Sequence, residues 1–457
     1  MQYKNILTVH RVKKVPQHRC DKCLPVPWTW ASRSISIKLV LSESGLVAYR
    51  PFVGERLLKF NLREFHMFLV DKPYISDFLK RTVRDYAIPV VGTDIAKKLD
   101  LYDGTRIISE EKAIAMFRET DDLPIYTTSE NAIGWISEHF AFSNLPAKIE
   151  LFKNKVKFRQ LTKSIFPDFY FQEVCVENLS AVKFNEIPLP FIIKPTVGFF
   201  SMGVYKISNH EEWLNAIGSI TREIEKVKGL YPEEVLDTSS FIIEQCIHGD
   251  EFAVDAYFDS TGEPVILGIL KHTFSSSTDV SDRIYTSSKD IIETNMEEFT
   301  SFVRKIGEVA GIKNFPVHIE LRRDIDGTLL PIEVNPMRFG GWCTTADLTF
   351  SAYGINPYLN YYSGIKPDWP EVLKEKEGKL FSIIILDNST GIDGAEILSF
   401  DYEKLLSNFE KPLELRKIDY RKYPVFGILF VETRGDNFVE LKNILDSDLN
   451  EFITSRG

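Results

Sequence analysis

Short apolar runs recur along the second half of this chain, and their alternation of hydrophobic and polar positions is typical of β-strands. Several of the runs are rich in Val, Ile and Phe, as in Phe191-Ile192-Ile193. This pattern predicts a region built largely from strands. The predicted strands are residues 191–194, 204–207, 241–244, 252–258, 265–272, 317–322 and 330–334.

Two helices are predicted between these strands. Residues 208–211 have the pattern of a capping box, which predicts a helix from there to about Lys228. Asp290 is placed to cap a second helix that ends near Gly311. Apolar residues recur at helical spacing along this second helix, and we interpret them as core packing. They are Ile292, Met296, Phe299, Val303 and Ile306.

The length of 457 residues suggests about three domains. Residues 1–150 include strand-like segments at 65–70 and 88–91, so we expect an amino-terminal α/β domain there. That segment carries no Gly-x-Gly-x-x-Gly fingerprint, which argues against a separate dinucleotide site. A charged stretch follows Asp368 and precedes further alternating strands and helices. We therefore expect residues 371–457 to form a small carboxy-terminal domain.

Composition and charge narrow the class of protein. Hydrophobic residues make up 44% and charged residues 26% of the chain, as in soluble globular proteins. The net charge of −10 and the lack of a basic stripe with interleaved aromatics argue against nucleic acid as a partner. No apolar run is long enough to span a membrane, and the first residues do not resemble a secretion signal. We therefore expect a cytoplasmic protein without a membrane partner.

The five cysteines are irregularly spaced and do not suggest a disulfide framework. Cys20 and Cys23 form the one close pair, which with His10 or His18 would make half of a zinc site. Because no second pair accompanies them, an ordinary pair of thiols is the favoured interpretation. The role of the pair stays open.

A glycine-bearing loop, residues 195–203, joins the first two predicted strands of the second half. Gly198 and Gly203 allow backbone conformations in which consecutive N–H groups surround phosphate oxygens. Ser201 lies between them, and Lys194 before the loop would add a positive charge. We therefore treat Lys194, Gly198, Ser201 and Gly203 as candidate phosphate contacts. A plain hairpin with glycine in its turn is the alternative.

A second candidate element lies where one strand ends and the next begins, between Glu244 and Glu251. One carboxylate can accept from an exocyclic amine and the other from ribose hydroxyls, since both ligand groups are hydrogen-bond donors. Amides of the linker, at Gln245 and Ile247, can meet the edge of the ring. The alternative is a pair of solvated strand ends.

The third element is a predicted hairpin that brings oxygen ligands together. Alternation along the strands places His318, Glu320 and Arg322 on one face of the first strand, and Glu333 and Asn335 on one face of the second. Carboxylates and a side-chain carbonyl suit Mg²⁺, which also binds through nucleotide phosphates. A hairpin with its acids in solvent is the alternative, but the opposite faces of both strands are strongly apolar, which favours a site.

The order of these elements resembles the ATP-grasp superfamily, over residues 151–364. The seven-residue gap from Glu244 to Glu251 and the thirteen-residue gap from Glu320 to Glu333 are typical of that family. The resemblance implies an α/β (α+β) fold with a pre-ATP-grasp domain at residues 1–150 and a carboxy-terminal domain at 371–457. Between them it implies an ATP-grasp domain at 151–370, with a lid lobe at about 155–250 and a metal-binding lobe at about 251–370.

The resemblance also implies roles for individual residues. Lys155 is similar in position to the first phosphate-contacting lysine of the family, and Lys194 is similar in position to the second. Lys153 and Lys157 are near enough to Lys155 to take its place. Glu244 resembles the adenine acceptor and Glu251 the ribose acceptor. The implied ligands of one or two Mg²⁺ ions, or of Mn²⁺, are Glu320, Glu333 and Asn335. Arg338 resembles the arginine that binds a substrate carboxylate or acyl phosphate.

The stretch Asn-Pro-Met-Arg-Phe-Gly-Gly-Trp, residues 335–342, most resembles the branch of amino-acid and dipeptide ligases, with carbamoyl-phosphate synthase-like proteins as relatives. That branch implies an ADP-forming enzyme that joins a small-molecule carboxylate to an amine through an acyl phosphate. Lys271 and His272 can contact phosphate or substrate, although a histidine at a strand end is more often structural. Relatives are often dimers, which makes a homodimer one candidate, and the oligomeric state stays open. A carboxylate–thiol or carbamoyl-phosphate-type enzyme and a non-catalytic ATP-binding module are the alternatives.

Overall fold

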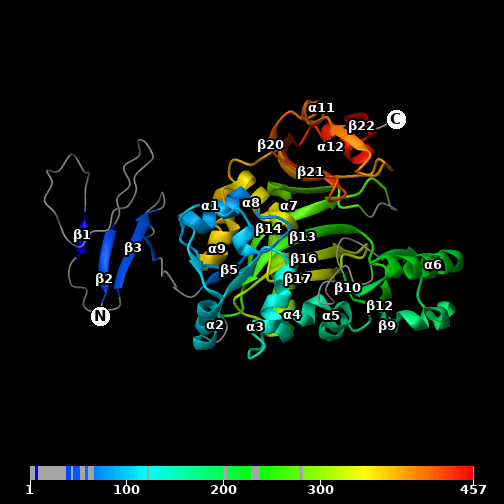
Figure 1. Ribbon diagram of the computed structural model, residues 1–457, viewed down its shortest axis with the longest axis horizontal. Coiled ribbons are helices and arrows are strands. Elements are labelled where there is room, and N and C mark those ends of the chain that lie inside the picture. Colours follow the sequence, from blue (N-terminus) through cyan, green and yellow to red (C-terminus); the bar gives the residue numbers. More distant parts are fainter. Residues whose placement is uncertain are drawn as a thin grey trace. The chain divides into compact units, whose positions relative to one another are not determined.

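The computed structural model describes residues 6–8, 38–42, 45–51, 57–59, 66–120, 123–198, 203–227, 237–276 and 281–455. The chain separates into two compact units, Met1–Glu64 and Phe65–Gly457. The first unit holds one antiparallel sheet in the order β1-β2-β3-β4 (Figure 1). Its strands are β1 (Ile6–Thr8), β2 (Lys38–Ser42), β3 (Gly45–Pro51) and β4 (Leu57–Lys59). The sequence did not lead us to expect this separate unit, and the Cys20/Cys23 pair lies outside the described residues.

The larger unit begins with a small parallel sheet, in the order β7-β6-β5-β8. Strands β5 and β6 confirm the strand-like segments predicted at 65–70 and 88–91, and Phe68 of β5 pairs with Val90 of β6 in parallel register. The strands are β5 (Met67–Leu69), β6 (Val90–Val91), β7 (Ile107–Ile108) and β8 (Ile125–Thr127). The helices of this part are α1 (Asp77–Asp85), α2 (Glu110–Glu119) and α3 (Ile133–His139).

A second sheet, which we name the lid sheet, has the order β11-β10-β12-β9 and carries helix α6 (His210–Val227). Its strands are β9 (Phe171–Cys175), β10 (Phe191–Val197), β11 (Tyr205–Ile207) and β12 (Asp237–Gln245). The capping box of α6 is one residue later than predicted. Asn209 accepts from the Glu212 N–H at 3.0 Å, and Glu212 accepts from the Ser208 N–H at 2.7 Å.

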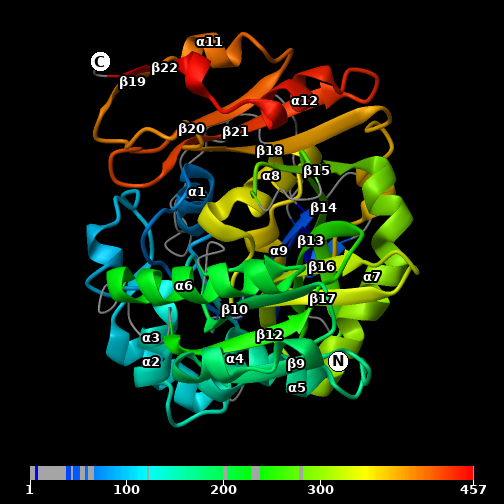
Figure 2. The ribbon, with the colours of Figure 1, turned by 90° about the vertical axis from the view of Figure 1, so that its right-hand side faces the viewer.

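The largest sheet has eight strands in the order β17-β16-β13-β14-β15-β18-β21-β20, all antiparallel to their neighbours. Three strands of the carboxy-terminal part, β18, β20 and β21, therefore extend the central sheet. The eight strands are β13 (Asp250–Phe258), β14 (Pro264–Thr273), β15 (Ile284–Ser288), β16 (Phe315–Arg323), β17 (Leu329–Pro336), β18 (Lys379–Asp387), β20 (Pro412–Lys417) and β21 (Val425–Arg434). The lid sheet lies beside β16 and β17 (Figures 1 and 2).

Helices cover the two faces of the large sheet. On one face Phe252 packs edge-to-face on Phe299 of α7 (Lys289–Ala310), and on the other Tyr257 packs on Tyr361 of α9 (Pro357–Ser363). The predicted apolar face of α7 is confirmed as core, although Ser288 and not Asp290 caps the helix. The other helices of the unit are α4 (Leu145–Lys153), α5 (Lys155–Thr162), α8 (Thr344–Tyr353), α10 (Trp369–Val372), α11 (Tyr402–Leu406) and α12 (Val439–Asp446), and strands β19 (Ile397–Phe400) and β22 (Ile453–Ser455) form a separate pair. In the described part of the chain, none of the helices is long and apolar enough to cross a membrane.

Candidate active site

The two predicted metal acids lie directly opposite each other on neighbouring strands. Glu320 of β16 and Glu333 of β17 are register partners, and so are His318 and Asn335. The Asn335 amide nitrogen donates to Glu333 at 3.1 Å, which leaves the amide oxygen as an acceptor. The predicted hairpin therefore brings the three oxygen-bearing side chains together on one face.

The charges of this pair are unbalanced. Burial first, and then the neighbouring Glu333 carboxylate, raise the pKa of Glu320 to about 7. Burial also acts to raise the pKa of Glu333, but Lys155 and Lys194 outweigh it, so that this pKa is lowered. A divalent cation between the two carboxylates would relieve their repulsion, and the donor set fits Mg²⁺. Among the residues that the structure describes, no three His, Cys, Asp or Glu side chains could hold a metal by themselves, so Asn335 and phosphate oxygens would complete the site.

His318 links the metal acids to a buried carboxylate. Its Nδ1 lies 2.8 Å from Asp255 Oδ1, and its Nε2 lies 3.7 Å from Glu320 Oε1. Burial lowers the pKa of His318, but the hydrogen bond with Asp255 and the nearby carboxylate of Glu320 outweigh this effect and raise the pKa to about 9. The imidazole is therefore a cation at neutral pH, and it lies between Asp255 and Glu320.

Of the three candidate lysines before the lid sheet, Lys155 is the one that faces the metal acids. Its Nζ lies 3.3 Å from Glu333 and 3.5 Å from the Gly198 carbonyl oxygen. Lys153 is paired with a different buried acid, and Lys157 is exposed and paired with Glu150. The chain turns between α4 and α5 at Asn154, whose side chain caps α5 and so aims Lys155 inward.

The glycine loop is described only at its two ends. Gly203 has φ +69°, a conformation that favours glycine, and a Cβ there would lie 3.2 Å from the Pro195 ring. Gly198 follows the end of β10 and offers its carbonyl to Lys155. Ser201 lies outside the described residues, so its predicted phosphate contact stays a prediction.

The buried carboxylate of Glu244 connects the lid sheet to the large sheet. Lys194 lies 2.7 Å from one oxygen and Arg159 of α5 lies 2.6 Å from the other. Burial opposes ionisation, but Arg159 and Lys194 outweigh it and lower the pKa of Glu244 to about 2. Arg159 also donates to the carbonyls of Pro331 and Ile332 at 2.6 and 3.3 Å. Sequence reasoning missed Arg159, which stands within a short run of basic residues that we read only for its lysines.

Glu251 is held on the same face of the sheet as the metal acids. It accepts from His272 Nδ1 at 3.0 Å and from Arg322 at 2.8 Å and 2.7 Å, and His272 is stacked on Tyr285. Burial acts to raise the pKa of Glu251, but His272 and Arg322 outweigh it, so the group stays ionised.

In the linker before Glu251, Ile247 offers its carbonyl to Arg322 at 2.7 Å. The backbone N–H of Gln245 donates to the Tyr170 carbonyl at 3.0 Å, and the side-chain oxygen of Gln245 accepts from the Tyr170 N–H at 2.9 Å. The backbone N–H of Gln245 is therefore already used beside the lid sheet, and the predicted contacts of Gln245 and Ile247 with the adenine ring stay a prediction.

Arg338 is half-buried and paired with an acid that the sequence did not suggest. Its guanidinium donates to Glu130 at 2.7 Å and to the Phe339 carbonyl at 2.9 Å. Glu130 also pairs with Lys153. Burial opposes ionisation of Glu130, but Lys153 and Arg338 outweigh it and hold its pKa well below the usual range. Glu130 comes from the amino-terminal part of the chain, where no motif pointed to it.

Lys271 is not brought to the site. It is the register partner of Phe252, which packs on α7, and its Nζ lies 2.8 Å from the exposed Asp250. Because side chains alternate along a strand, Lys271 lies on the opposite face from His272 and Glu251. Its predicted catalytic role is therefore not supported by its position.

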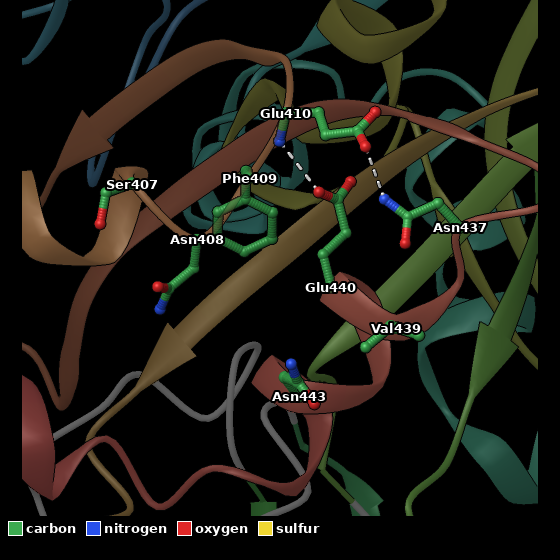
Figure 3. A pocket seen from close by; sticks show the side chains of 8 residues that line it. All are labelled: Ser407, Asn408, Phe409, Glu410, Asn437, Val439, Glu440 and Asn443. Atoms are coloured by element: carbon green, nitrogen blue, oxygen red, sulfur yellow. Dashed lines mark hydrogen bonds between the residues drawn. The ribbon is translucent and has the colours of Figure 1, made fainter.

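A hollow of about 310 Å³ lies in the carboxy-terminal part, and none of the site residues lines it (Figure 3). Figure 3 shows the side chain of Glu440, which lies in the first turn of α12, directed toward the backbone of Glu410. The buried carboxylate of Glu440 accepts from the Thr433 hydroxyl at 2.5 Å and from the Glu410 N–H at 2.9 Å. Because both its oxygens have donors, we regard this carboxylate as a structural group.

Comparison with protein families matches residues 187–346 to a model described as an ATP-grasp domain. This match contains β10 to β12, the opposed strands β16 and β17, and Arg338. A comparison with curated proteins finds no match.

Solved structures share the fold over most of the chain at low identity. An L-amino acid ligase from Bacillus licheniformis is 17% identical, with a TM-score of 0.58, and the alignment covers 86% of this chain and 99% of that one. A biotin carboxylase from Campylobacter jejuni, described as a complex with β,γ-ATP, is 16% identical with a TM-score of 0.55, over 85% and 92% of the two chains. An N5-carboxyaminoimidazole ribonucleotide synthetase from Thermotoga maritima is 14% identical with a TM-score of 0.56, over 85% and 98%.

Proposed function

We propose that the protein is an ATP-dependent ligase that joins a carboxylate to an amine. The proposal starts from residues 187–346, which match a model described as an ATP-grasp domain, and from the fold shared with an L-amino acid ligase. The observation that carries the proposal is the opposed pair Glu320 and Glu333. Lys155 lies 3.3 Å from Glu333, and the charges of both glutamates act on Arg338. Metal acids, a phosphate-binding cation and a substrate-binding cation are the groups that phosphoryl transfer to a carboxylate requires.

In this proposal the nucleotide lies between the lid sheet and the large sheet. Lys155 and Lys194 bind its phosphates, together with N–H groups of the glycine loop. Glu244 accepts from the adenine amine, since each of its oxygens keeps a second acceptor position beside Lys194 or Arg159. Glu251 accepts from the ribose hydroxyls.

Glu320, Glu333 and the Asn335 oxygen are the residues that would hold Mg²⁺. When bound, the ion neutralises charge on the transferring phosphoryl group and orients it. Glu320 would then be ionised in the complex. This accounts for two half-buried carboxylates that lie opposite each other, an arrangement in which their repulsion is costly without a cation.

The proposed chemistry needs no nucleophile from the protein. An oxygen of the substrate carboxylate attacks the γ-phosphorus, the bond from γ-phosphorus to the bridging oxygen breaks, and ADP leaves. The amine nitrogen then attacks the acyl carbon, phosphate leaves with the former carboxylate oxygen, and the amine loses a proton to form the amide. Arg338 holds the carboxylate and stabilises the oxyanion of the second step with hydrogen bonds from its guanidinium.

The amine as acceptor is supported by the stretch of residues 335–342 and by the likeness to a protein named as an L-amino acid ligase. A thiol or hydroxyl acceptor would use the same residues for the first step, and so would a carbamoyl-phosphate-type reaction. The acceptor of the acyl group is therefore to be identified by the panel of substrates described next.

The test is ADP and phosphate release from Mg-ATP across a panel of amino acids and other carboxylates, each with amines, thiols or alcohols. We expect amines to stimulate release, and Glu333→Gln to abolish it. Asp250→Asn is the matched control, because that acid lies on the opposite face of the same sheet. Stimulation by thiols or alcohols alone would identify a different ligase, and ATP binding without turnover on any pair would favour a binding module.

A further inference from the structure

One buried carboxylate, Asp255 of β13, contacts three separate elements behind the candidate site. It is 1% exposed. Its Oδ1 accepts from His318 Nδ1 at 2.8 Å and from the Gly340 N–H at 3.0 Å, and its Oδ2 accepts from the Thr345 hydroxyl. Because an ionised carboxylate is only an acceptor, His318 must carry a proton on Nδ1. In the part of the chain that the structure describes, no lysine or arginine is paired with Asp255.

The first contact leads to the metal acids. Asp255 and His318 are register partners, and His318 is in turn the partner of Asn335. The bond from Asp255 to Nδ1 fixes the ring, so that Nε2 points toward Glu320 at 3.7 Å. Such an arrangement, in which a carboxylate orients an imidazole beside a metal ligand, is how outer residues of metal sites fix the ligands themselves.

The second contact of Asp255 holds the loop that carries Arg338, the arginine proposed to bind the substrate. Gly340 lies two residues after Arg338, and its N–H is shared between Asp255 and the Thr345 hydroxyl, at 3.0 and 2.9 Å. The approach is close, because a Cβ on Gly340 would lie 2.3 Å from Thr345 Oγ1. At its other end the loop is held by Met337, whose N–H donates to Pro316 and whose carbonyl accepts from Thr127. The segment that carries Arg338 is therefore fixed on both sides.

We propose that Asp255 is a positioning residue that sets the spacing between the metal acid Glu320 and Arg338. The alternative is that Asp255 only satisfies buried donors during folding. The positioning role rests on the proposed function, because it assumes that Glu320 binds a metal. It goes further in assigning one residue, remote from the reacting atoms, to the alignment of the metal with the bound substrate.

A carboxylate suits this role better than its amide. Asparagine at this position keeps one acceptor oxygen for the two N–H donors, but it presents an NH₂ group to the Thr345 hydroxyl and loses the negative charge. Hydrogen bonds to a charged acceptor are roughly twice as strong as neutral ones. Asp255→Asn therefore keeps the volume of the side chain while it loosens both links.

The experiment measures Mn²⁺ binding by electron paramagnetic resonance at saturating ADP, for the full-length wild-type protein and for the full-length Asp255→Asn variant. Second-layer substitutions at metal sites weaken metal binding by roughly 10- to 100-fold, and we expect about 10-fold here. ADP affinity without metal should change less than about twofold, because Asp255 does not contact the residues assigned to the nucleotide. In hydrogen exchange, the peptide that contains Gly340 should exchange faster.

Glu440→Gln is the matched control, because Glu440 is also a buried carboxylate that accepts from a threonine hydroxyl and a backbone N–H. It lies away from the site and should leave Mn²⁺ affinity unchanged. If Asp255→Asn does not fold, His318→Gln replaces it, and the same loss of Mn²⁺ affinity is expected because the ring that orients Glu320 is removed.

Unchanged Mn²⁺ affinity in a folded Asp255→Asn or His318→Gln variant would overturn the positioning role. An equal loss in Glu440→Gln would do the same, since the effect would then reflect general destabilisation. If the unaltered protein does not bind Mn²⁺ with ADP, the metal site of the proposed function is wrong, which is a separate outcome.

Discussion

Replacing Arg159 with methionine removes the cation that joins the lid sheet to the large sheet. The Arg159 side chain is 3% exposed, and its guanidinium reaches Glu244 at 2.6 Å and the carbonyls of Pro331 and Ile332. Methionine keeps much of the apolar volume but none of the donors. Glu244 would then keep Lys194 alone as a partner.

The magnitude follows from what is left behind. Breaking a buried ion pair by removing one partner costs about 3–5 kcal/mol, and each buried carbonyl left without a donor costs about 1–3 kcal/mol. Because Lys194 still compensates part of the charge of Glu244, we expect a loss at the low end of this sum, about 5 kcal/mol. For a large domain this lowers the melting temperature by roughly 10–20 °C, at about 2–4 °C for each kcal/mol.

The assay is differential scanning calorimetry of the wild type, Arg159→Met, Glu244→Gln and the double variant. Residues in one ion-pair network are not independent, so the double variant should be destabilised by less than the sum of the single variants. Arg159→Lys should be intermediate, because a lysine restores the charge but not the fork of donors. A melting temperature of Arg159→Met within about 2 °C of the wild type, or additive effects, would show that Arg159 does not join the two sheets in this way.

Three further predictions concern the site and its surroundings. Lys155→Met should lower ADP release by roughly 10- to 100-fold, the worth of a charged hydrogen bond, whereas Lys157→Met, at an exposed position, should change it less than about twofold; equal effects would contradict the assignment. The pKa of Glu244 is lowered from 4.5 to about 2, so its stabilisation is complete above pH 4.5 and is lost as the pH falls toward 2. The difference in unfolding free energy between wild type and Glu244→Gln should therefore narrow by about 2 kcal/mol from pH 4.5 to 3 in denaturant titrations, and a constant difference would count against it. Gly340→Ala should destabilise the protein by about 1–3 kcal/mol, because its Cβ would clash with a side chain of α8, whereas Gly341→Ala, with nothing within 4 Å, should not; similar melting temperatures would contradict this.

The sequence predicted the strands that carry the site because strand alternation is a local property. The predicted convergence of the oxygen ligands depends on a short turn between two neighbouring strands, and in the structure Glu320 and Glu333 are register partners on those strands. The ends of helices are less well defined by a local pattern. Ser288 and Asp290 are both good N-cap residues, and the sequence did not show that Ser288 caps α7.

The contacts that the sequence did not predict join residues distant along the chain. Glu130 meets Arg338 across 208 positions, and Arg159 meets Glu244 across 85. No periodicity or spacing reports such a pairing, because it results from the packing of separate elements. Lys271 illustrates the converse, since its neighbour His272 points to the site and strand alternation alone turns Lys271 to the other face.

The most direct test of the account follows the oxygen atoms of the carboxylate substrate. With a carboxylate and amine found in the release panel, the carboxylate is labelled with ¹⁸O and the released phosphate is analysed by mass spectrometry. An acyl phosphate transfers one carboxylate oxygen to phosphate, so the account predicts one labelled oxygen in each phosphate released. Unlabelled phosphate, or AMP in place of ADP as the nucleotide product, would contradict it.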